Sequence, residues 1–390
     1  MIVYYISPAV IPSRTANSIH VVSMCEALTE LSYDVSLFVR SEGLDSQASN
    51  EVIENFYGVS NKNIEVVTYN SKRARGAEFF IALRAFFRFI KDALTGNIPQ
   101  HIISRNLYGA ILLGLLLRNS IAYETHSPEK GIRKRLQKWL LNSNKIQTVV
   151  ISEALRKILM NMYCVSKERI HVFHDAAREE KSIKSFDERV NAQNHFLGSR
   201  IDLSQYEKIV GYFGHLYSGR GIEIIQDLAI KKPNHAFVVY GGNKSEINHF
   251  RTINSCSNLF FMGHIPHNKV HIAMSMMNIL LMPYQKTVSV GLEGVDTSQW
   301  MSPMKMFEYM SVGVPIISSD LPVIREVLVD EYNSLLVEPD NVEEWLDALN
   351  RISNSTDLEE SLAINAYKDF KEKYTWNIRA KAILGLNVLN

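Results

Sequence analysis

The chain has 390 residues, of which 46% are hydrophobic and 21% charged, and this composition excludes a disordered or fibrous protein. Its formal net charge of +1 excludes a global field that would attract nucleic acid, and three widely separated cysteines indicate neither a disulfide framework nor a zinc site. A chain of this length exceeds one ordinary core, so we expect two domains.

Neither a signal peptide nor a membrane span is expected. The chain opens directly into the strand-like "IVYYIS" at 2–7, without a charged region followed by an apolar one. The most apolar run, "AILLGLLL" at 110–117, is shorter than the roughly 20 residues that a membrane helix needs and predicts a core helix. We therefore expect a cytoplasmic protein.

Short apolar strands alternate with helical patterns along the whole chain, which predicts parallel sheets with crossover helices. The first helix is expected at about 18–31, and a polar stretch at 181–206 reads as a linker or insert. We predict an α/β protein with two doubly wound, Rossmann-like domains that face each other across a cleft. The expected domains are 1–180, with a tail helix at about 374–390 packing back onto it, and 207–373.

In doubly wound sheets, ligands bind in the loops that follow the strands. The first such loop, "SPAVIPSRTANSIH", places Arg14 before a helix, Asn17 at its expected N-cap and His20 in its first turn. These groups could receive a polar ligand. Simple helix capping explains them at least as well.

The stretch "YETHSP" places Glu124, Thr125 and His126 where a strand of the first domain ends. A histidine there could polarise a sugar hydroxyl or donate to a transferring group. An ordinary hydrogen-bonded histidine is the alternative, and this stretch alone favours it.

The stretch "GHLYSGRG" at 214–221 follows a strand and precedes an amphipathic run. Its glycines let the backbone approach a ligand, Arg220 can bind phosphate oxygens with two donors, and His215 adds a titratable donor. A flexible turn with a solvated arginine is an equal alternative. The spacing matches neither G-x-G-x-x-G nor the Walker loop.

The stretch "SPMKMFEYMSVG" predicts a helix that begins with Ser302 as N-cap and Pro303 as first residue and ends before Gly313. Lys305 in the first turn makes this helix start attractive to phosphate, and Glu308 could accept hydrogen bonds from a ribose diol. A surface ion pair between Lys305 and Glu308 is the alternative and, for this stretch alone, the favoured one.

Two basic segments, 71–92 and 130–138, carry lysine and arginine; the first also carries several phenylalanines. Such helices can lie on anionic lipid headgroups. Alternatively, the phenylalanines face the core and the cations form a solvated outer face.

Taken together, these stretches resemble the family-4 retaining glycosyltransferases, two-domain enzymes of the GT-B fold. The resemblance covers most of the chain through "PSRTANSIHVVSMCEAL", "YETHSP", "VVISEALRKIL", "GYFGHLYSGRG", "SPMKMFEYMSVGVPIISSDLPVIREVL" and "YTWNIRAKAIL". Two positions depart from the family pattern: Trp300 stands where the first Glu of an E-x7-E motif belongs, and His215 where an arginine is usual.

The resemblance implies roles for individual residues. Arg220 and Lys305 would stabilise the diphosphate, Glu308 would bind the ribose, and His126 would meet the donor sugar, which makes these four the catalytic candidates. The implied donor site is Gly214, His215, Arg220, Gly263, Ser302, Pro303, Met304, Lys305 and Glu308. The implied acceptor site is Arg14, Asn17 and His20.

The resemblance thus implies a retaining transferase that moves a sugar from a nucleotide diphosphate sugar to a glycan or lipid-linked acceptor, in bacterial surface polysaccharide biosynthesis. We expect no metal, no other cofactor and no nucleic-acid partner. An anionic membrane surface, on the inner face of the cell membrane, is a further candidate partner. Two rivals stay open: a nucleotide-sugar 2-epimerase of the same architecture and a non-catalytic nucleotide-sugar-binding subunit.

Overall fold

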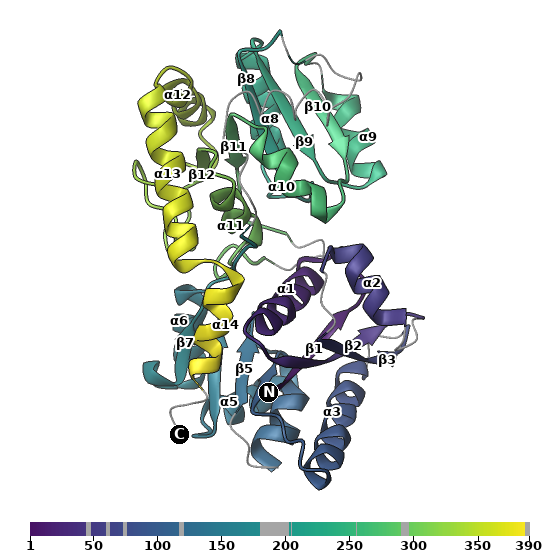
Figure 1. Ribbon diagram of the computed structural model, residues 1–390. Helices are drawn as coiled ribbons and strands as arrows, with labels where there is room; N and C mark the ends of the chain where they lie inside the picture. Colours follow the sequence, from purple (N-terminus) through teal and green to yellow (C-terminus); the bar gives the residue numbers. More distant parts are fainter. Residues whose placement is uncertain are drawn as a thin grey trace. The chain divides into compact units, whose positions relative to one another are not determined.

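The computed structural model describes residues 1–43, 48–59, 63–72, 76–116, 121–179, 203, 205–254, 256–289 and 296–386. The chain divides into two compact units (Figure 1). Unit 1 comprises Met1–Asp175 together with Trp376–Asn390, and unit 2 comprises Ala176–Thr375. Apart from residues 203, 205 and 206, the predicted linker at 181–206 lies outside the described residues.

Unit 1 is built on a seven-stranded parallel sheet in the order β3-β2-β1-β4-β5-β6-β7. The chain winds outward from β1 in one direction and then from β4 in the other, which is the doubly wound arrangement. The strands are β1 Ile2–Val10, β2 Asp34–Ser41, β3 Ile64–Asn70, β4 His101–Ser104, β5 Ile121–Thr125, β6 Ile146–Val150 and β7 Ile170–Val172.

The strands of unit 1 are apolar because helices cover both faces of a parallel sheet. All five residues of β5, for example, are buried. The helices are α1 Ala16–Glu30, α2 Ala48–Tyr57, α3 Ala77–Leu94, α4 Leu107–Gly109, α5 Gly131–Leu141, α6 Glu153–Tyr163 and α14 Trp376–Gly385, with a π-helix at Ala110–Leu116 and a 3-10 turn at Lys167–Arg169. The C-terminal helix α14 packs against α1.

Two details of unit 1 bear on the expectations from the sequence. The apolar run that begins at Ala110 is helical, and Leu113 is fully buried, as predicted for a core helix. The N-cap of α1 is Thr15, whose hydroxyl accepts from the Ser18 amide, so the prediction that Asn17 is the cap was wrong. The chain enters this helix two residues earlier because the Thr15 hydroxyl satisfies an amide of the first turn.

Unit 2 is built on a six-stranded parallel sheet in the order β10-β9-β8-β11-β12-β13. Its strands are β8 Lys208–Phe213, β9 His235–Tyr240, β10 Leu259–Gly263, β11 Ile279–Met282, β12 Ile316–Ser319 and β13 Leu335–Val337. Its helices are α8 Ile222–Lys231, α9 Lys244–Ile253, α10 His267–Ser275, α11 Met304–Ser311, α12 Val342–Ser353 and α13 Thr356–Lys373. Two parallel α/β sheets confirm the predicted fold class.

Helix α11 begins one residue later than the sequence suggested. Pro303 occupies the N-cap position, and Ser302 precedes it as a buried residue, so the prediction of Ser302 as N-cap was wrong. Proline is tolerated there because the first amides of a helix have no intrahelical acceptor. The helix ends as predicted, with Gly313 in the left-handed conformation at φ 62°.

Among the described residues, no helix is both long and apolar enough to cross a bilayer.

Candidate functional site

In unit 2, the glycine-rich loop after β8 is pressed against the segment that follows β11. Gly219 and Gly221 have φ angles of 80° and 75°, and a Cβ at these positions would lie 2.0 Å from the Thr287 carbonyl oxygen and 1.9 Å from that of Pro283. Both positions therefore require glycine for conformation and for space. The close approach fixes Arg220, which stands between the two glycines.

Arg220 is directed inward by this loop. Its Nη2 donates to the carbonyl oxygen of Ser289 at 3.0 Å, and its guanidinium carbon lies 5.1 Å from the ring centroid of Tyr284. Its Nε is buried without a hydrogen-bond acceptor. Arg220 is thus a packed cation with unused donor capacity rather than the solvated arginine of a flexible turn.

Lys305 projects from the first turn of α11 into the same region. Its ammonium nitrogen is buried without an acceptor and lies 4.2 Å from the ring centroid of Tyr212 and 4.4 Å from that of Tyr284. Burial, helped by the charge of Arg220, holds the pKa of Lys305 well below its ordinary value. The alternative of a surface ion pair does not describe this lysine.

Arg220 and Glu308, which stands on α11 three residues after Lys305, both influence this region electrostatically. Both act on Lys305: Arg220 lowers its pKa and Glu308 raises it. Both also act on Tyr284, again in opposite directions. The charges of the two residues predicted to bind the diphosphate and the ribose therefore both reach this lysine and this tyrosine.

The remaining predicted donor residues line the neighbouring turns. A Cβ at Gly214 would lie 3.6 Å from Nζ of Lys305, so this glycine brings backbone beside the lysine. His215 stacks on Tyr217 with ring centroids 4.7 Å apart, and its pKa is lowered by burial and by Arg220. Gly263 ends β10 and accepts the Gly241 amide at 2.8 Å. Ser302 and Pro303 lead into α11, and Met304 is its first residue.

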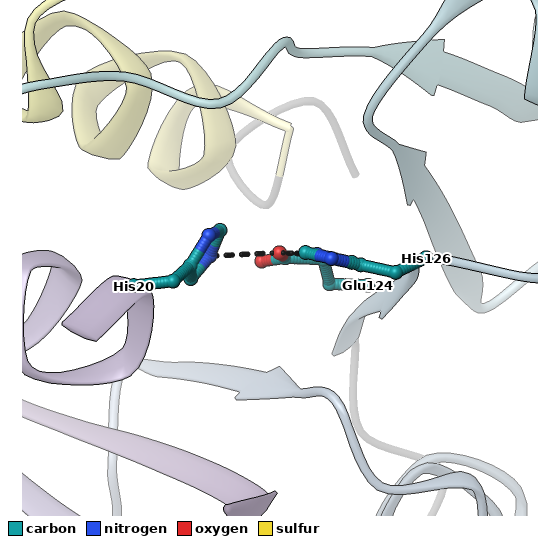
Figure 2. Close-up of side chains that lie close together, drawn as sticks. All are labelled: His20, Glu124 and His126. Carbon is teal, nitrogen blue, oxygen red and sulfur yellow. Dashed lines mark hydrogen bonds and ion pairs between the residues drawn. The ribbon is translucent and has the colours of Figure 1, made fainter. Parts of the chain in front are cut away.

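Unit 1 contains a separate cluster around Glu124, at the end of β5 (Figure 2). Its carboxylate is 1% exposed, and its Oε1 lies 2.9 Å from Nε2 of His20 and 2.7 Å from Nε2 of His126. The other ring nitrogen of His20, Nδ1, lies 2.9 Å from Oδ1 of Asp175. The sequence separates these groups by up to 155 positions, and the sheet brings them together.

Two guanidinium groups complete this cluster. Nη2 of Arg379, on α14, lies 3.1 Å from Oε1 of Glu124, and Nε of Arg105 lies 3.7 Å from it. Burial by itself would raise the pKa of Glu124, but Arg379, His20 and Arg105 outweigh burial and hold this pKa well below its ordinary value. Glu124 is therefore an ionised carboxylate inside the unit.

His20, Glu124 and His126 each offer one ligand atom, and these atoms lie within 4.8 Å of one another. Spacing alone would admit a metal ion. However, Arg379 and Arg105 already compensate the charge of Glu124, the only carboxylate of this trio, and would repel a metal cation. Metal independence stays a prediction.

The three residues predicted to bind the acceptor do not share one environment. Arg14 and Asn17 are exposed, whereas His20 is 1% exposed and engaged by Glu124 and Asp175. Direct acceptor contact is therefore open to Arg14 and Asn17, and the burial of His20 favours a supporting role instead.

Sequence reasoning missed Tyr212, Tyr284, Arg105, Asp175 and Arg379. The tyrosines could have been suspected, because Tyr212 lies in β8 just before the 214–221 loop, Tyr284 lies in the loop after β11, and ligands bind in the loops that follow such strands. Nothing in the local pattern singles out Arg379, since its meaning depends on how α14 returns to unit 1.

The basic aromatic segment at 71–92 forms α3, and its phenylalanines are mostly not in the core. Phe89 is buried, but Phe79, Phe80 and Phe87 are 43%, 47% and 60% exposed. Its arginines are partly engaged: Arg84 donates to the Thr68 carbonyl oxygen, and Arg88 pairs with Glu65 and Asp92. The alternative of a phenylalanine face directed into the core is therefore wrong for most of these rings. Arg73 and Arg75 lie outside the described residues.

Comparison with known proteins agrees with this architecture. Residues 201–369 match the family model described as Glycosyl transferases group 1. A relative from Methanocaldococcus jannaschii, "Uncharacterized glycosyltransferase MJ1178", is 24% identical over 177 residues. The match covers 45% of this chain and 45% of the relative, so the chain spans less than half of that relative's length.

Solved structures resemble the whole chain. Anabaena Alr3699/HepE in complex with UDP matches with a TM-score of 0.72 at 14% identity, covering 99% of each chain. WaaG, described as a glycosyltransferase involved in lipopolysaccharide biosynthesis, matches with a TM-score of 0.63 at 10% identity, covering 98% of each chain. At such identities the likeness establishes the fold. Residues 201–369 are therefore similar to the glycosyl transferases group 1 family, and the chain has the GT-B fold.

Proposed function

We propose that this protein is a retaining glycosyltransferase whose donor, a nucleotide diphosphate sugar, binds to unit 2. The observation that carries the proposal is the buried ammonium group of Lys305, which has no hydrogen-bond acceptor and lies between two tyrosine rings beside Arg220. A buried cation without an acceptor is costly. Its retention at the start of a helix is understandable if an anionic ligand completes the site.

A diphosphate has the chemistry that this site requires. Its oxygens would accept from Lys305, from the spare donors of Arg220 and from the free amides at the start of α11. During transfer the bond between the sugar and the diphosphate breaks, and negative charge grows on the leaving phosphate. Cations fixed before the reaction stabilise that charge without a metal ion. We expect activity to survive exhaustive treatment with EDTA.

The remaining roles follow the same resemblance. Glu308 would accept hydrogen bonds from the ribose hydroxyls, His126 would meet the donor sugar, and Arg14 and Asn17 would contact the acceptor. Attack on the same face that the leaving group departs from would retain the configuration of the sugar. The complex of Alr3699/HepE with UDP, a protein of the same fold, supports a nucleotide-bearing donor.

We propose a lipid-linked glycan as the acceptor, in surface polysaccharide biosynthesis. The supporting observation is that α3 and α5 of unit 1 each carry exposed apolar side chains and exposed cations. The two helices are joined by the ion pair between Arg133 and Glu78 at 2.7 Å. We call these exposed side chains together the α3–α5 surface; they are Phe79, Phe80, Phe87, Lys91, Ile132, Lys134, Arg135, Lys138 and Trp139.

Aromatic rings and cations together suit the headgroup region of an anionic membrane, where the rings enter the interface and the cations remain among phosphates. Such a surface would hold the enzyme beside a lipid-linked acceptor on the inner face of the cell membrane. The lipopolysaccharide role in the description of WaaG is in keeping with such an acceptor.

Labelled UDP-, GDP- and ADP-sugars test the reaction class. Slow hydrolysis of one donor, abolished in Lys305→Met, is the expected result for a transferase without acceptor. An isomerised donor would indicate a 2-epimerase, and an intact but bound donor would indicate a non-catalytic subunit. Either outcome overturns the proposed transfer.

A further inference from the structure

The Glu124 cluster joins segments that are far apart in the chain. Around one buried carboxylate on β5 stand groups from α1, from the turns after β4, β5 and β7, and from the C-terminal helix α14. The groups that face Glu124 or His126 are His20, Arg105, Asp175 and Arg379.

The contacts of His126 fix its tautomer. Nη2 of Arg105 lies 3.2 Å from Nδ1 of His126, and because a guanidinium group can only donate, Nδ1 must carry the lone pair. Nε2 then carries the hydrogen and donates it to Oε1 of Glu124 at 2.7 Å. In this arrangement the ring is neutral, and both of its nitrogens are occupied. His126 therefore contributes as a fixed neutral ring rather than as a proton donor to the reaction.

The arrangement depends on an ionised and correctly oriented Glu124. Nη1 of Arg379 lies 3.3 Å from Oε2 and Nη2 lies 3.1 Å from Oε1, so this side chain spans both oxygens of the carboxylate. Arg379 is 3% exposed and comes from a helix 255 positions further along the chain.

We propose that Arg379 is a positioning residue for His126: by clamping and neutralising Glu124, the C-terminal helix keeps the His126 ring neutral and oriented. The value of this device for sugar transfer rests on the proposed function, but the state of His126 does not. It can be measured in the absence of any donor.

The charges around His126 give the direction of the effect. Burial and the charge of Arg105 lower the pKa of His126 to about 4, while Glu124 and Asp175 act in the opposite sense. Removing Arg379 leaves the charge of Glu124 less compensated. The carboxylate then favours the protonated ring, whose Nδ1 can no longer accept from Arg105.

Arg379 could instead serve only to anchor α14, because its Nε and Nη2 also donate to the carbonyl oxygens of His174 at 2.9 Å and Phe173 at 3.4 Å. A control variant separates the two roles. Asn377→Ala removes a contact between α14 and α1, the 2.7 Å hydrogen bond from Asn377 to Glu30, and leaves every charge at Glu124 in place.

The experiment is an NMR titration of the His126 ring in the full chain, without donor, in the parent and in Arg379→Met, Arg379→Lys and Asn377→Ala. In the parent and in Asn377→Ala, we expect no titration of His126 above about pH 5. In Arg379→Met the pKa of His126 should rise by about one unit or more, and in Arg379→Lys it should stay near the value of the parent. Should Arg379→Met fail to fold, Arg379→Gln retains donors without the charge and replaces it.

An unchanged His126 titration in a folded Arg379→Met or Arg379→Gln protein would overturn the proposal, as would an equal shift in Asn377→Ala. If donor turnover is established, the acid limb of its pH profile should move to higher pH in Arg379→Met. A His126 shift in a protein that turns over no donor would uphold the positioning role while refuting the proposed function.

Discussion

Nζ of Lys305 lies 4.4 Å from the ring centroid of Tyr284, and the same ring is also approached by Arg220. One tyrosine thus keeps two cations close together in the interior of unit 2. Attraction between a cation and an aromatic face is worth about 2 kcal/mol when the pair is desolvated, which is less than a buried charge requires. The site is accordingly prepared for an anion.

Lys305→Met should separate donor binding from stability. We expect the affinity for UDP or another matching nucleoside diphosphate to fall about 10- to 100-fold, because a charge-assisted contact is lost. The melting temperature without ligand should stay the same or rise, because an unpaired buried cation disappears. Thermal shift with and without nucleotide measures both. Lys286→Met, which removes an exposed lysine paired with Glu338 in the same unit, is the matched control and should bind normally.

Gly221→Ala should disrupt the loop that carries Arg220. Its Cβ would stand 1.9 Å from the Pro283 carbonyl oxygen in a backbone with φ 75°, so both packing and conformation oppose it. Nucleotide-induced stabilisation should be lost. The control is Gly313→Ala, which also has positive φ but nothing within 4 Å of the new Cβ, and which should cost only about 1 kcal/mol. Equal behaviour of the two variants in calorimetry would contradict the packing argument.

Stability should fall on acidification from pH 7 to 5. Burial is the chief cause that lowers the pKa values of His126 and His235 in the folded chain, so the unfolded chain binds more protons below about pH 6.5. The unfolding free energy therefore decreases as pH falls. His126, with its pKa near 4, should account for about 2 kcal/mol of the loss at pH 5.

The lowered pKa values of Glu124 and Asp175 extend this trend, since their stabilisation is lost as pH falls below the ordinary carboxyl range. Urea denaturation at pH 7, 6 and 5 provides the measurement. A midpoint that does not change with pH would refute this account, and His126→Gln should flatten part of the slope.

The α3–α5 surface should bind anionic vesicles. Phe87→Ser, which removes a 60% exposed ring, should weaken co-sedimentation with phosphatidylglycerol vesicles. Replacing Lys134 and Lys138 by serine should also weaken it, and the difference between this variant and the parent should become smaller in high salt. Ile364→Ser removes a comparably exposed apolar side chain from unit 2 and should change nothing. Vesicle binding that is unchanged in both α3–α5 variants would contradict the prediction that this surface binds membranes.

The alternation of apolar strands with helical patterns was enough to predict the fold class and nearly all strands. Buried parallel strands carry continuous apolar runs, and such runs are local features of sequence. The strand β7 was not predicted, because its three residues include His171 and form no continuous apolar run. Helix starts were misplaced by one or two residues at Asn17 and Ser302: Thr15 caps α1 with its hydroxyl, whereas Pro303 occupies the N-cap of α11 without a side-chain hydrogen bond.

For the site, the sequence by itself determined the loop glycines, Arg220, Lys305 and Glu308, because glycines, cations and a helix start follow one another within short stretches. Only the tertiary structure decided that Lys305 is enclosed by Tyr212 and Tyr284, and that His20 is buried against Glu124 with Arg379. Burial, charge compensation and tautomer are properties of the groups that surround a side chain. In a wound sheet those groups come from distant parts of the chain, where no local pattern records them.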